Sequence, residues 1–500
     1  MKNIYMFGVL PLVLSACGYE EYSKMDYYGD ESYDTSSEAV DIERHQVQTE
    51  EGVEVNQWVE TQEDGTSTFS ADVDSGSYSL ARRALVEGRL PEIDTVRVEE
   101  FINYFHYDDP RPGDELPFSV NLETAPSEFG DAPDIHMLRI GIQAKEIPVE
   151  NRDPVNLVFL LDVSGSMSSP DKLGLVQFAM KNLVDKLSPD DTLGIVVYAG
   201  SEGVVLEPTA VENKSEIMDA LDALQAGGST NGEAGIRSAY DLAESAFRSD
   251  GVNRVVLCTD GDMNVGLTGD SLIQLVEEYR DRDIFLTTLG FGQGNYNDAL
   301  MEQLADRGNG NYAYIDSPNE ALRVLGENLV STLQVVAKDV KIQVDFDASN
   351  VERWRLVGYE NRLLEDEDFE NDQVDAGDIG AGHSVTALYE LDLVDAPDVG
   401  NLAQVKLRYK EPTADISTEH AWEMVASERL ERFEDASADF RFGVAVSEFA
   451  EILRHSPHSS DARFDDILSI GRAAAPEESR SVSKSEFLDL VEIAQALSGE

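Results

Sequence analysis

The sequence predicts an α/β protein whose central part is a doubly wound, mostly parallel sheet, joined to a flanking β-rich unit and C-terminal helices. The main observation is that apolar segments alternate with amphipathic ones between residues 154 and 337. A strand buried in a parallel sheet is apolar on both faces, whereas a helix that covers the sheet is apolar on one. On both sides of this region apolar and polar residues alternate singly, which is typical of antiparallel strands.

The composition limits the classes of partner. The chain has 500 residues and is 42% apolar, enough for about two to four domains with substantial cores. Its net charge is −60, from 98 acidic and 38 basic residues. Such a surface repels nucleic-acid phosphates and attracts cations and basic partners, so we expect no nucleic acid partner. The charge is either a solvated surface suited to a salty habitat or a specific acidic binding face.

The N-terminus has the features of a secretory signal. Lys2 precedes an apolar stretch, residues 4–14, that is too short to span a membrane comfortably. It ends in Leu14-Ser15-Ala16-Cys17, which resembles a bacterial lipobox. The resemblance implies that residues 1–16 are a lipoprotein signal peptide and that Cys17 carries the lipids of a membrane anchor. No Asp follows Cys17, which favours the outer membrane, facing the periplasm or the surface. The alternative is an ordinary secretory signal with an incidental cysteine.

The segments before the central region are predicted from composition and spacing. Residues 17–64 are acidic, with Lys24 and Arg44 as the only bases, and are expected to form a disordered tether. Residues 65–153 are expected to form an N-terminal flanking domain. Helical spacing predicts short helices over 78–85 and 96–105. Single alternation predicts strands around 118–122 and 138–142.

Residues 154–337 are predicted to form the doubly wound domain. Its expected strands are 156–161, 192–198, 254–259, 284–290 and 312–315. Its expected helices are 172–187, 214–225, 233–247, 270–281, 297–306 and 318–335. Ligands of such sheets bind at the carboxyl ends of the strands.

Residues 338–500 are predicted to form a C-terminal flanking domain, a β-unit followed by helices. Alternation over 340–346 and 405–409 indicates antiparallel strands. Helices are expected from Asp439 onward, and Ser483 with Glu486 resembles a capping box at the start of the last one. Because strands occur on both sides of the central domain, the two flanks are expected to be able to form one β-rich unit around it.

A set of oxygen-bearing residues follows two of the predicted strands. Asp162, Ser164 and Ser166 come directly after the strand at 156–161, and Asp260 follows the strand at 254–259. Thr230 lies in a loop that begins Gly227-Gly228. If those two strands are neighbours, these five residues converge. Carboxylate and hydroxyl oxygens suit a hard cation such as Mg²⁺. The alternative is that these residues only cap helices and form turns.

The arrangement resembles the metal-ion-dependent adhesion site of von Willebrand factor type A (VWA) domains, which have a Rossmann-like fold. The resemblance implies that Asp162, Ser164, Ser166 and Thr230 bind the metal directly or through water, and that Asp260 acts through water. Few protein charges leave the ion electrophilic, so an open position can accept an Asp or Glu carboxylate from a protein partner. Mg²⁺ fits best, with Mn²⁺ and Ca²⁺ as alternatives.

The flanks also carry a resemblance, to YfbK-type bacterial VWA lipoproteins. It rests on three segments outside the central domain and on the turn that follows Thr259. These segments are 67–74, 96–105, 259–266 and 440–445. The likeness covers nearly everything after the tether and implies architecture more than function.

Other motifs are weaker. Asp72-Val73-Asp74-Ser75 imitates the metal motif but lacks a preceding buried strand, so it is interpreted as a turn and helix start. Asp260-x-Asp262-x-Asn264 resembles a calcium loop, but position 12 is Ser271 instead of Glu and the glycine comes one place late, so an EF-hand is not predicted. Cys258 lies in an apolar strand and is expected to be a buried thiol. We find no phosphate-binding loop, no His-Glu-x-x-His motif and no nucleophile–base pair, so an enzyme is not predicted.

Three functions fit these features. The favoured one is an envelope lipoprotein that binds a protein partner through a divalent cation. The alternative is a structural envelope scaffold in which the metal only stabilises the VWA loops. A metal-dependent hydrolase is the least favoured, because no general base can be named.

Overall fold

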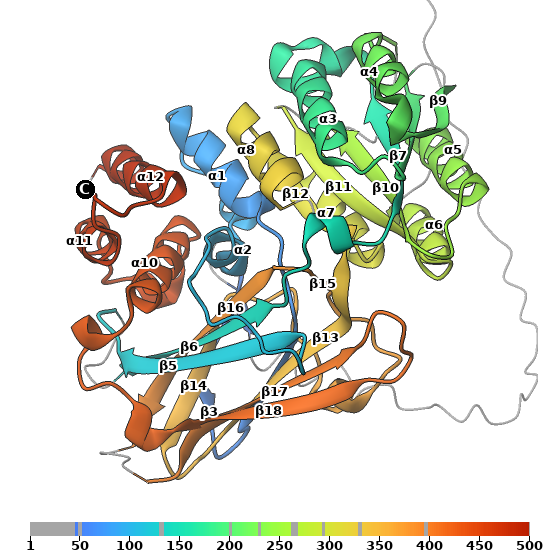
Figure 1. Cartoon of the computed structure of the whole chain (residues 1–500). Coiled ribbons are helices and arrows are strands. Elements are labelled where there is room, and N and C mark those ends of the chain that lie inside the picture. Colours follow the sequence, from blue (N-terminus) through green and yellow to red (C-terminus); the bar gives the residue numbers. More distant parts are fainter. Residues whose placement is uncertain are drawn as a thin grey trace, which may run out of the picture. The chain divides into compact units, whose positions relative to one another are not determined.

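The central domain is built on a six-stranded sheet (Figure 1). The computed structural model describes residues 46–48, 53–129, 135–199, 203–228, 232–261, 269–292, 296–328, 333–394 and 399–499. The sheet order is β12-β11-β10-β7-β8-β9. All neighbours are parallel except β8 and β9. The strands are β7 Val155–Asp162, β8 Thr192–Tyr198, β9 Gly203–Ala210, β10 Val252–Thr259, β11 Ile284–Phe291 and β12 Tyr312–Ile315. The predicted α/β class with a mostly parallel sheet is therefore confirmed.

Helices cover both faces of this sheet. Buried residues of α3, α4 and α8 form one core, and those of α5, α6 and α7 form the other. In β7, Leu157 and Phe159 point to the first core while Val158 and Leu160 point to the second, which explains why the strand is continuously apolar. The helices are α3 Leu175–Lys186, α4 Lys214–Asp222, α5 Gly232–Ser245, α6 Gly269–Arg280, α7 Asp298–Arg307 and α8 Pro318–Leu322.

The segments before and after the central domain share two antiparallel sheets. One has the order β15-β13-β17-β18, and β4 pairs with the edge of β13 opposite β17. The second has the order β3-β14-β16-β6-β5. Their apolar faces contribute to a single core. The strands are β3 Val59–Glu60, β4 Thr66–Ser70, β5 Phe118–Pro126, β6 Ile135–Ala144, β13 Val335–Phe346, β14 Val351–Val357, β15 Ile379–Gly380, β16 Ser384–Leu393, β17 Asn401–Lys410 and β18 Thr418–Val425. The central domain is therefore an insertion between strands of one β-unit.

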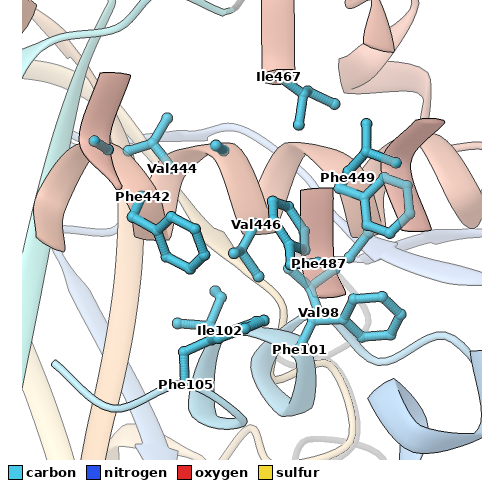
Figure 2. Packing of buried hydrophobic residues seen from close by; sticks show 14 of the residues in the cluster. Val98, Phe101, Ile102, Phe105, Phe442, Val444, Val446, Phe449, Ile467 and Phe487 are labelled. Carbon is cyan, nitrogen blue, oxygen red and sulfur yellow. The ribbon is translucent and has the colours of Figure 1, made fainter. Parts of the chain in front are cut away.

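A helical cluster also joins the two flanks (Figure 2). Phe105, which follows α2, lies edge-on to Phe442 of α10 and Phe487 of α12, at ring-centroid distances of 5.1 and 5.6 Å. Phe449 of α10 contacts Phe487 at 5.5 Å. Edge-to-face pairs of this kind stabilise a core beyond the area that they bury. The helices are α1 Gly76–Val86, α2 Val98–Asn103, α10 Ala438–Leu453, α11 Phe464–Ala474 and α12 Val482–Ser498.

The predicted disordered tether, 17–64, is wrong at its C-terminal end. Residues 53–64 are described and include β2 Glu54–Asn56, which pairs with β1 Gln46–Gln48, and β3, which pairs with β14. The buried Asn56 side chain donates hydrogen bonds to the carbonyl oxygens of Leu356 and Gly358, at 3.1 and 2.7 Å. These partners lie about 300 residues away, so no local pattern in the acidic segment announces them.

Three further expectations differ from the structure. The helix predicted over 318–335 ends earlier, because α8 continues only as a π-helical turn to Glu327 and β13 begins at Val335. Strand β9 was not predicted, because as an edge strand it exposes Val204 and Val205. The capping box at Ser483 is also wrong. Ser481 is the N-cap and accepts from the Lys484 amide at 3.2 Å, because alternate serines offer several hydroxyls there.

The remaining helices agree with the predictions, and Ser75 is the N-cap of α1, as the turn interpretation of Asp72–Ser75 expected. Across the described residues, no helix combines the length and the apolar character needed to cross a bilayer. The signal peptide and Cys17 lie outside the described residues. Apart from the C-terminal end of the tether, the domain boundaries taken from the sequence stay a prediction.

Candidate metal centre

Asp162 lies at the carboxyl end of β7, in the middle of the central sheet. Its side chain is fully buried. Oδ1 accepts a hydrogen bond from the Ser164 amide at 2.8 Å, and Oδ2 accepts one from the Thr259 hydroxyl at 3.2 Å. Thr259 ends the neighbouring strand β10. The adjacency of these two strands, on which the predicted site depends, is therefore present, and two hydrogen bonds fix the orientation of the Asp162 carboxylate.

The two serines of the motif lie side by side. Ser164 is buried and Ser166 is exposed, and their Oγ atoms are 2.8 Å apart. Ser166 belongs to the 3₁₀ turn Gly165–Ser168, which follows β7 directly. The site is therefore closed on the side of the sheet and open to solvent at Ser166.

The glycine loop is hydrogen-bonded to the serine loop. The Gly227 amide donates to the Val163 carbonyl at 2.7 Å, and the Gly165 amide donates to the Gly228 carbonyl at 3.1 Å. Gly228 has a φ of +94°, a conformation that favours glycine. Thr230, the predicted ligand from this loop, lies outside the described residues. The segment that leads to Thr230 is nevertheless brought alongside Ser164.

Asp260 directly follows β10, and its side chain is also buried. Its Oδ2 accepts a hydrogen bond from the ammonium group of Lys172 at 2.8 Å. Within the part of the chain that the structure describes, its Oδ1 is buried and has no hydrogen-bond partner. A buried carboxylate oxygen without a partner carries a desolvation cost, which a cation or a cation-bound water relieves.

The electrostatics of the site favour a cation. Burial raises the pKa of Asp162, and the charge of Asp260 raises it further, against the hydrogen bonds from Ser164 and Thr259. The Asp162 carboxylate is therefore costly to ionise while Asp260 is charged. A positive ion between them would reverse this effect.

The oxygen atoms present fit a hard divalent ion. Two carboxylates and two hydroxyls are the described donors, and Ser166 marks the open side. Among the described residues, no group of three or more His, Cys, Asp or Glu side chains is close enough together to hold a metal. Hydroxyl groups and water would therefore complete the coordination shell, which suits Mg²⁺ because this ion retains several waters.

Lys172 is the residue of this site that the sequence reasoning missed. It lies in the π-helical turn Pro170–Gly174, at the start of the helix predicted from residue 172. The sequence feature that points to it is its position. Lys172 is the first residue of a helix face that is otherwise apolar, six residues after Ser166. Its aliphatic stem packs over Gly292, where an added Cβ would lie 2.3 Å from the Lys172 Cγ. Gly292 therefore makes room for this side chain.

A helix of the N-terminal flank contacts the same turn. Arg83 of α1 forms an ion pair with Asp171 at 2.8 Å and donates a hydrogen bond to the Tyr314 hydroxyl at 3.0 Å. Asp171 precedes Lys172. The turn that carries Lys172 is therefore fixed to α1 on one side and to Asp260 on the other.

Comparisons with known proteins agree with this architecture. The family description "von Willebrand factor type A domain" matches residues 156–328, "von Willebrand factor" matches 45–136, and "Uncharacterized protein YfbK, C-terminal" matches 331–497. The uncharacterized protein YfbK of Escherichia coli K12 is 39% identical over 457 residues, which are 86% of this chain and 78% of that protein.

Two further relatives cover less or differ more. An uncharacterized Synechocystis protein is 33% identical over 207 residues, 41% of this chain and 48% of that protein. A solved von Willebrand factor type A structure from Catenulispora acidiphila is 14% identical, with a TM-score of 0.43, and covers 77% of this chain and 97% of that one.

VWA domains in general mediate protein interactions, and they commonly bind a divalent metal. The family-model match to the central domain and the identity over most of the chain together establish the relationship. The chain therefore belongs to the YfbK family of von Willebrand factor type A domain proteins.

Proposed function

We propose that this protein is a lipid-anchored envelope protein that binds a protein partner through a divalent cation held by Asp162, Ser164, Ser166, Thr230 and Asp260. The observation that carries the proposal is the buried Oδ1 of Asp260, which has no hydrogen-bond partner among the described residues and lies in the same site as the buried Asp162. Ser166 leaves the opposite side open to solvent. This is the arrangement that a metal with a free coordination position requires.

The partner group that fits is a carboxylate. A bound Mg²⁺ would supply an electrophilic centre with exchangeable waters, and an Asp or Glu of the partner would replace one of them. Mn²⁺ has similar ligand preferences, and Ca²⁺ also takes oxygen ligands. We assign no catalytic residue, so the proposed function is binding.

The location is part of the same proposal. The lipobox-like Leu14-Ser15-Ala16-Cys17 supports a lipid anchor at Cys17. The next residue is Gly18 and not Asp, which supports the outer membrane. Growth with labelled palmitate should label the wild-type chain and leave a Cys17→Ser variant unlabelled. A labelled Cys17→Ser variant would contradict the anchor.

Calorimetry tests the metal site. The mature chain, residues 17–500 with Cys17→Ser, is stripped of metal and titrated with Mg²⁺, Mn²⁺ and Ca²⁺. We expect saturable binding that Asp162→Ala abolishes while the circular dichroism spectrum is unchanged. Asp190→Ala is the matched control, because Asp190 is an exposed carboxylate before the amino end of β8, away from the site. Absence of heat in the folded wild-type chain would contradict the proposal.

The scaffold function remains the second candidate, favoured by a specific observation. The serine and glycine loops meet at the site, where the Gly165 amide donates to the Gly228 carbonyl, so a metal bound between them would hold the two loops together. This function predicts that the site binds metal but that the bound metal does not take up a carboxylate from a partner or from solution. Titration of the Mn²⁺-loaded chain with acetate separates the two, because only an open coordination position takes up the carboxylate.

A further inference from the structure

We propose that Lys172 determines the specificity of the metal centre by neutralising part of the charge of Asp260, so that a bound divalent ion retains positive charge for a carboxylate ligand. This inference rests on the proposed function. It assigns a role to a side chain outside the five predicted ligands. It also implies that Lys172 lowers the affinity of the site for the metal itself.

The contact between Lys172 and Asp260 is built into the fold. The ion pair spans 2.8 Å, and the exposed fractions of the two side chains are 11% and 3%. Pro170 and the hydrogen bond from the Lys172 amide to the Ser169 carbonyl, at 3.1 Å, fix the start of the turn. Gly292, with a φ of +74°, leaves the space that the lysine stem fills. Lys172 is therefore directed at Asp260 by its backbone and by its packing.

Lys172 shares the Asp260 carboxylate without using both of its oxygens. The ammonium group contacts Oδ2, whereas Oδ1 is left without a partner among the described residues. The lysine therefore compensates charge at one oxygen and leaves the other for a metal-bound water. This division argues against a simple internal salt bridge in which the lysine replaces the metal.

The charges of the site decide the consequence. Among the described residues of the site, Asp162 and Asp260 contribute two negative charges, and Lys172 contributes one positive charge. With a divalent ion bound, this set keeps one net positive charge, which attracts a carboxylate. Without Lys172 the two aspartates would just neutralise the ion. Nearby, Asp171 is already paired with Arg83 and does not offset this balance.

Two opposite changes are expected in Lys172→Met. Methionine keeps most of the unbranched stem that packs over Gly292 but removes the charge. Because a positive charge near the site repels a divalent ion, we expect Lys172→Met to bind Mg²⁺ and Mn²⁺ about tenfold more tightly or better. Because the metal-bound site then carries less positive charge, its affinity for a carboxylate should fall.

The experiment uses the mature chain with Cys17→Ser, with and without Lys172→Met. Calorimetry gives the affinity for Mn²⁺. Acetate is then titrated into the Mn²⁺-loaded proteins, and the loss of water proton relaxation reports the replacement of metal-bound water. Lys172→Arg is the matched control because it keeps the charge, and Lys172→Gln replaces Lys172→Met if the methionine variant does not fold, as judged by circular dichroism.

The outcomes separate this inference from the proposed function. Tighter Mn²⁺ binding together with weaker acetate binding in Lys172→Met, and neither change in Lys172→Arg, supports the role. Equal or weaker Mn²⁺ binding in Lys172→Met overturns it while leaving the metal site intact. Absence of Mn²⁺ binding in every variant, including the parent, overturns both.

Discussion

Arg82 of α1 forms a two-point ion pair with Asp316, the residue that follows the last strand of the central sheet. The Nη2–Oδ1 distance is 2.6 Å, the Nε–Oδ2 distance is 2.8 Å, and both side chains are 7% exposed. Nη2 also lies 2.9 Å from Glu320 of α8. A helix of the N-terminal flank is therefore joined to the central domain by a buried, bidentate arginine.

Replacing this arginine should lower stability strongly. Arg82→Ala leaves the buried Asp316 carboxylate without its partner, so we expect the free energy of unfolding to fall by about 3–5 kcal/mol. Urea denaturation followed by circular dichroism measures the change. Arg432→Ala is the control, since Arg432 is exposed and pairs with Asp435 three residues away, and its urea midpoint should not move. Equal midpoints for the two variants would contradict the role of Arg82.

The same cluster predicts a loss of stability in acid. Burial alone would raise the pKa of Glu320, but Arg323 and Arg82 outweigh it and lower the pKa to about 2, from 4.5. A lowered carboxyl pKa contributes stability above the unfolded value that is lost as the pH falls through the folded value. We therefore expect the contribution of Glu320 to disappear between pH 4.5 and 2, and Glu320→Gln to show a flatter stability profile there. A profile identical to wild type would contradict this.

Glu99 predicts the opposite slope near neutral pH. Burial, then the charges of Glu360 and Asp72, raise its pKa to about 7, from 4.5, and its Oε1 is buried without a hydrogen-bond partner in the described part of the chain. The folded state then binds more protons than the unfolded state between these values, so this contribution to stability falls as the pH rises.

Glu99→Gln should remove that slope. Glu99 Oε2 accepts a hydrogen bond from the Tyr359 amide at 2.9 Å. The side-chain oxygen of glutamine keeps an acceptor for this amide. We expect the variant to be more stable than wild type at pH 8, by about 1–3 kcal/mol, and to differ little at pH 4.5. Thermal melts from pH 4.5 to 8 measure the difference. A variant that is less stable at pH 8 would show that Glu99 is held charged.

Metal should stabilise the fold without being required for it. Ser164, Gly165 and Gly227 hold the site loops by hydrogen bonds that need no ion, and Lys172 already compensates Asp260. The chelated chain should therefore stay folded, and Mg²⁺ at 100 times its Kd should add about 2.7 kcal/mol. Melts with chelator and with Mg²⁺ test this. Unfolding by chelator alone would favour the scaffold function.

Cys258 should report unfolding of the central sheet. It is fully buried in β10, and burial raises the pKa of its thiol, so both access and thiolate formation are suppressed. In the chain with Cys17→Ser it is the one thiol, since the sequence has two cysteines. We expect no reaction with a disulfide reagent in the folded protein and one equivalent after unfolding in urea. Rapid reaction of the native chain would contradict the burial.

Most of the fold could be predicted from local sequence patterns. Strands of the central sheet were predictable because β7 and β10 are apolar on both faces, and their carboxyl ends place Asp162 and Asp260 together because the two strands are neighbours. The residues that were missed depend on distant partners. Asn56 is ordered by carbonyl groups of β14, and β9 is an edge strand whose exposed valines do not give a buried pattern.

The part of the site that lies in one short sequence motif could be predicted, whereas a contact between residues far apart in the sequence could not. Asp162, Ser164 and Ser166 form one short motif, whereas Lys172 acts on Asp260 across 88 residues. A lysine in a helical stretch normally lies in solvent, whereas here the space left by Gly292 lets the lysine stem reach the carboxylate. Thr230 and Cys17 stay predictions.

The insertion of the central domain has a consequence for synthesis on the ribosome. Thr68 of β4 contacts Gln343 of β13 across 275 residues of sequence. At about 5–20 residues per second, roughly 15–55 seconds pass before the partner of β4 emerges. The doubly wound domain is contiguous, and its sheet contains no strand from either flank. The nascent β-unit meanwhile exposes unpaired strand edges, which makes it the part of the chain that most needs chaperone protection before release.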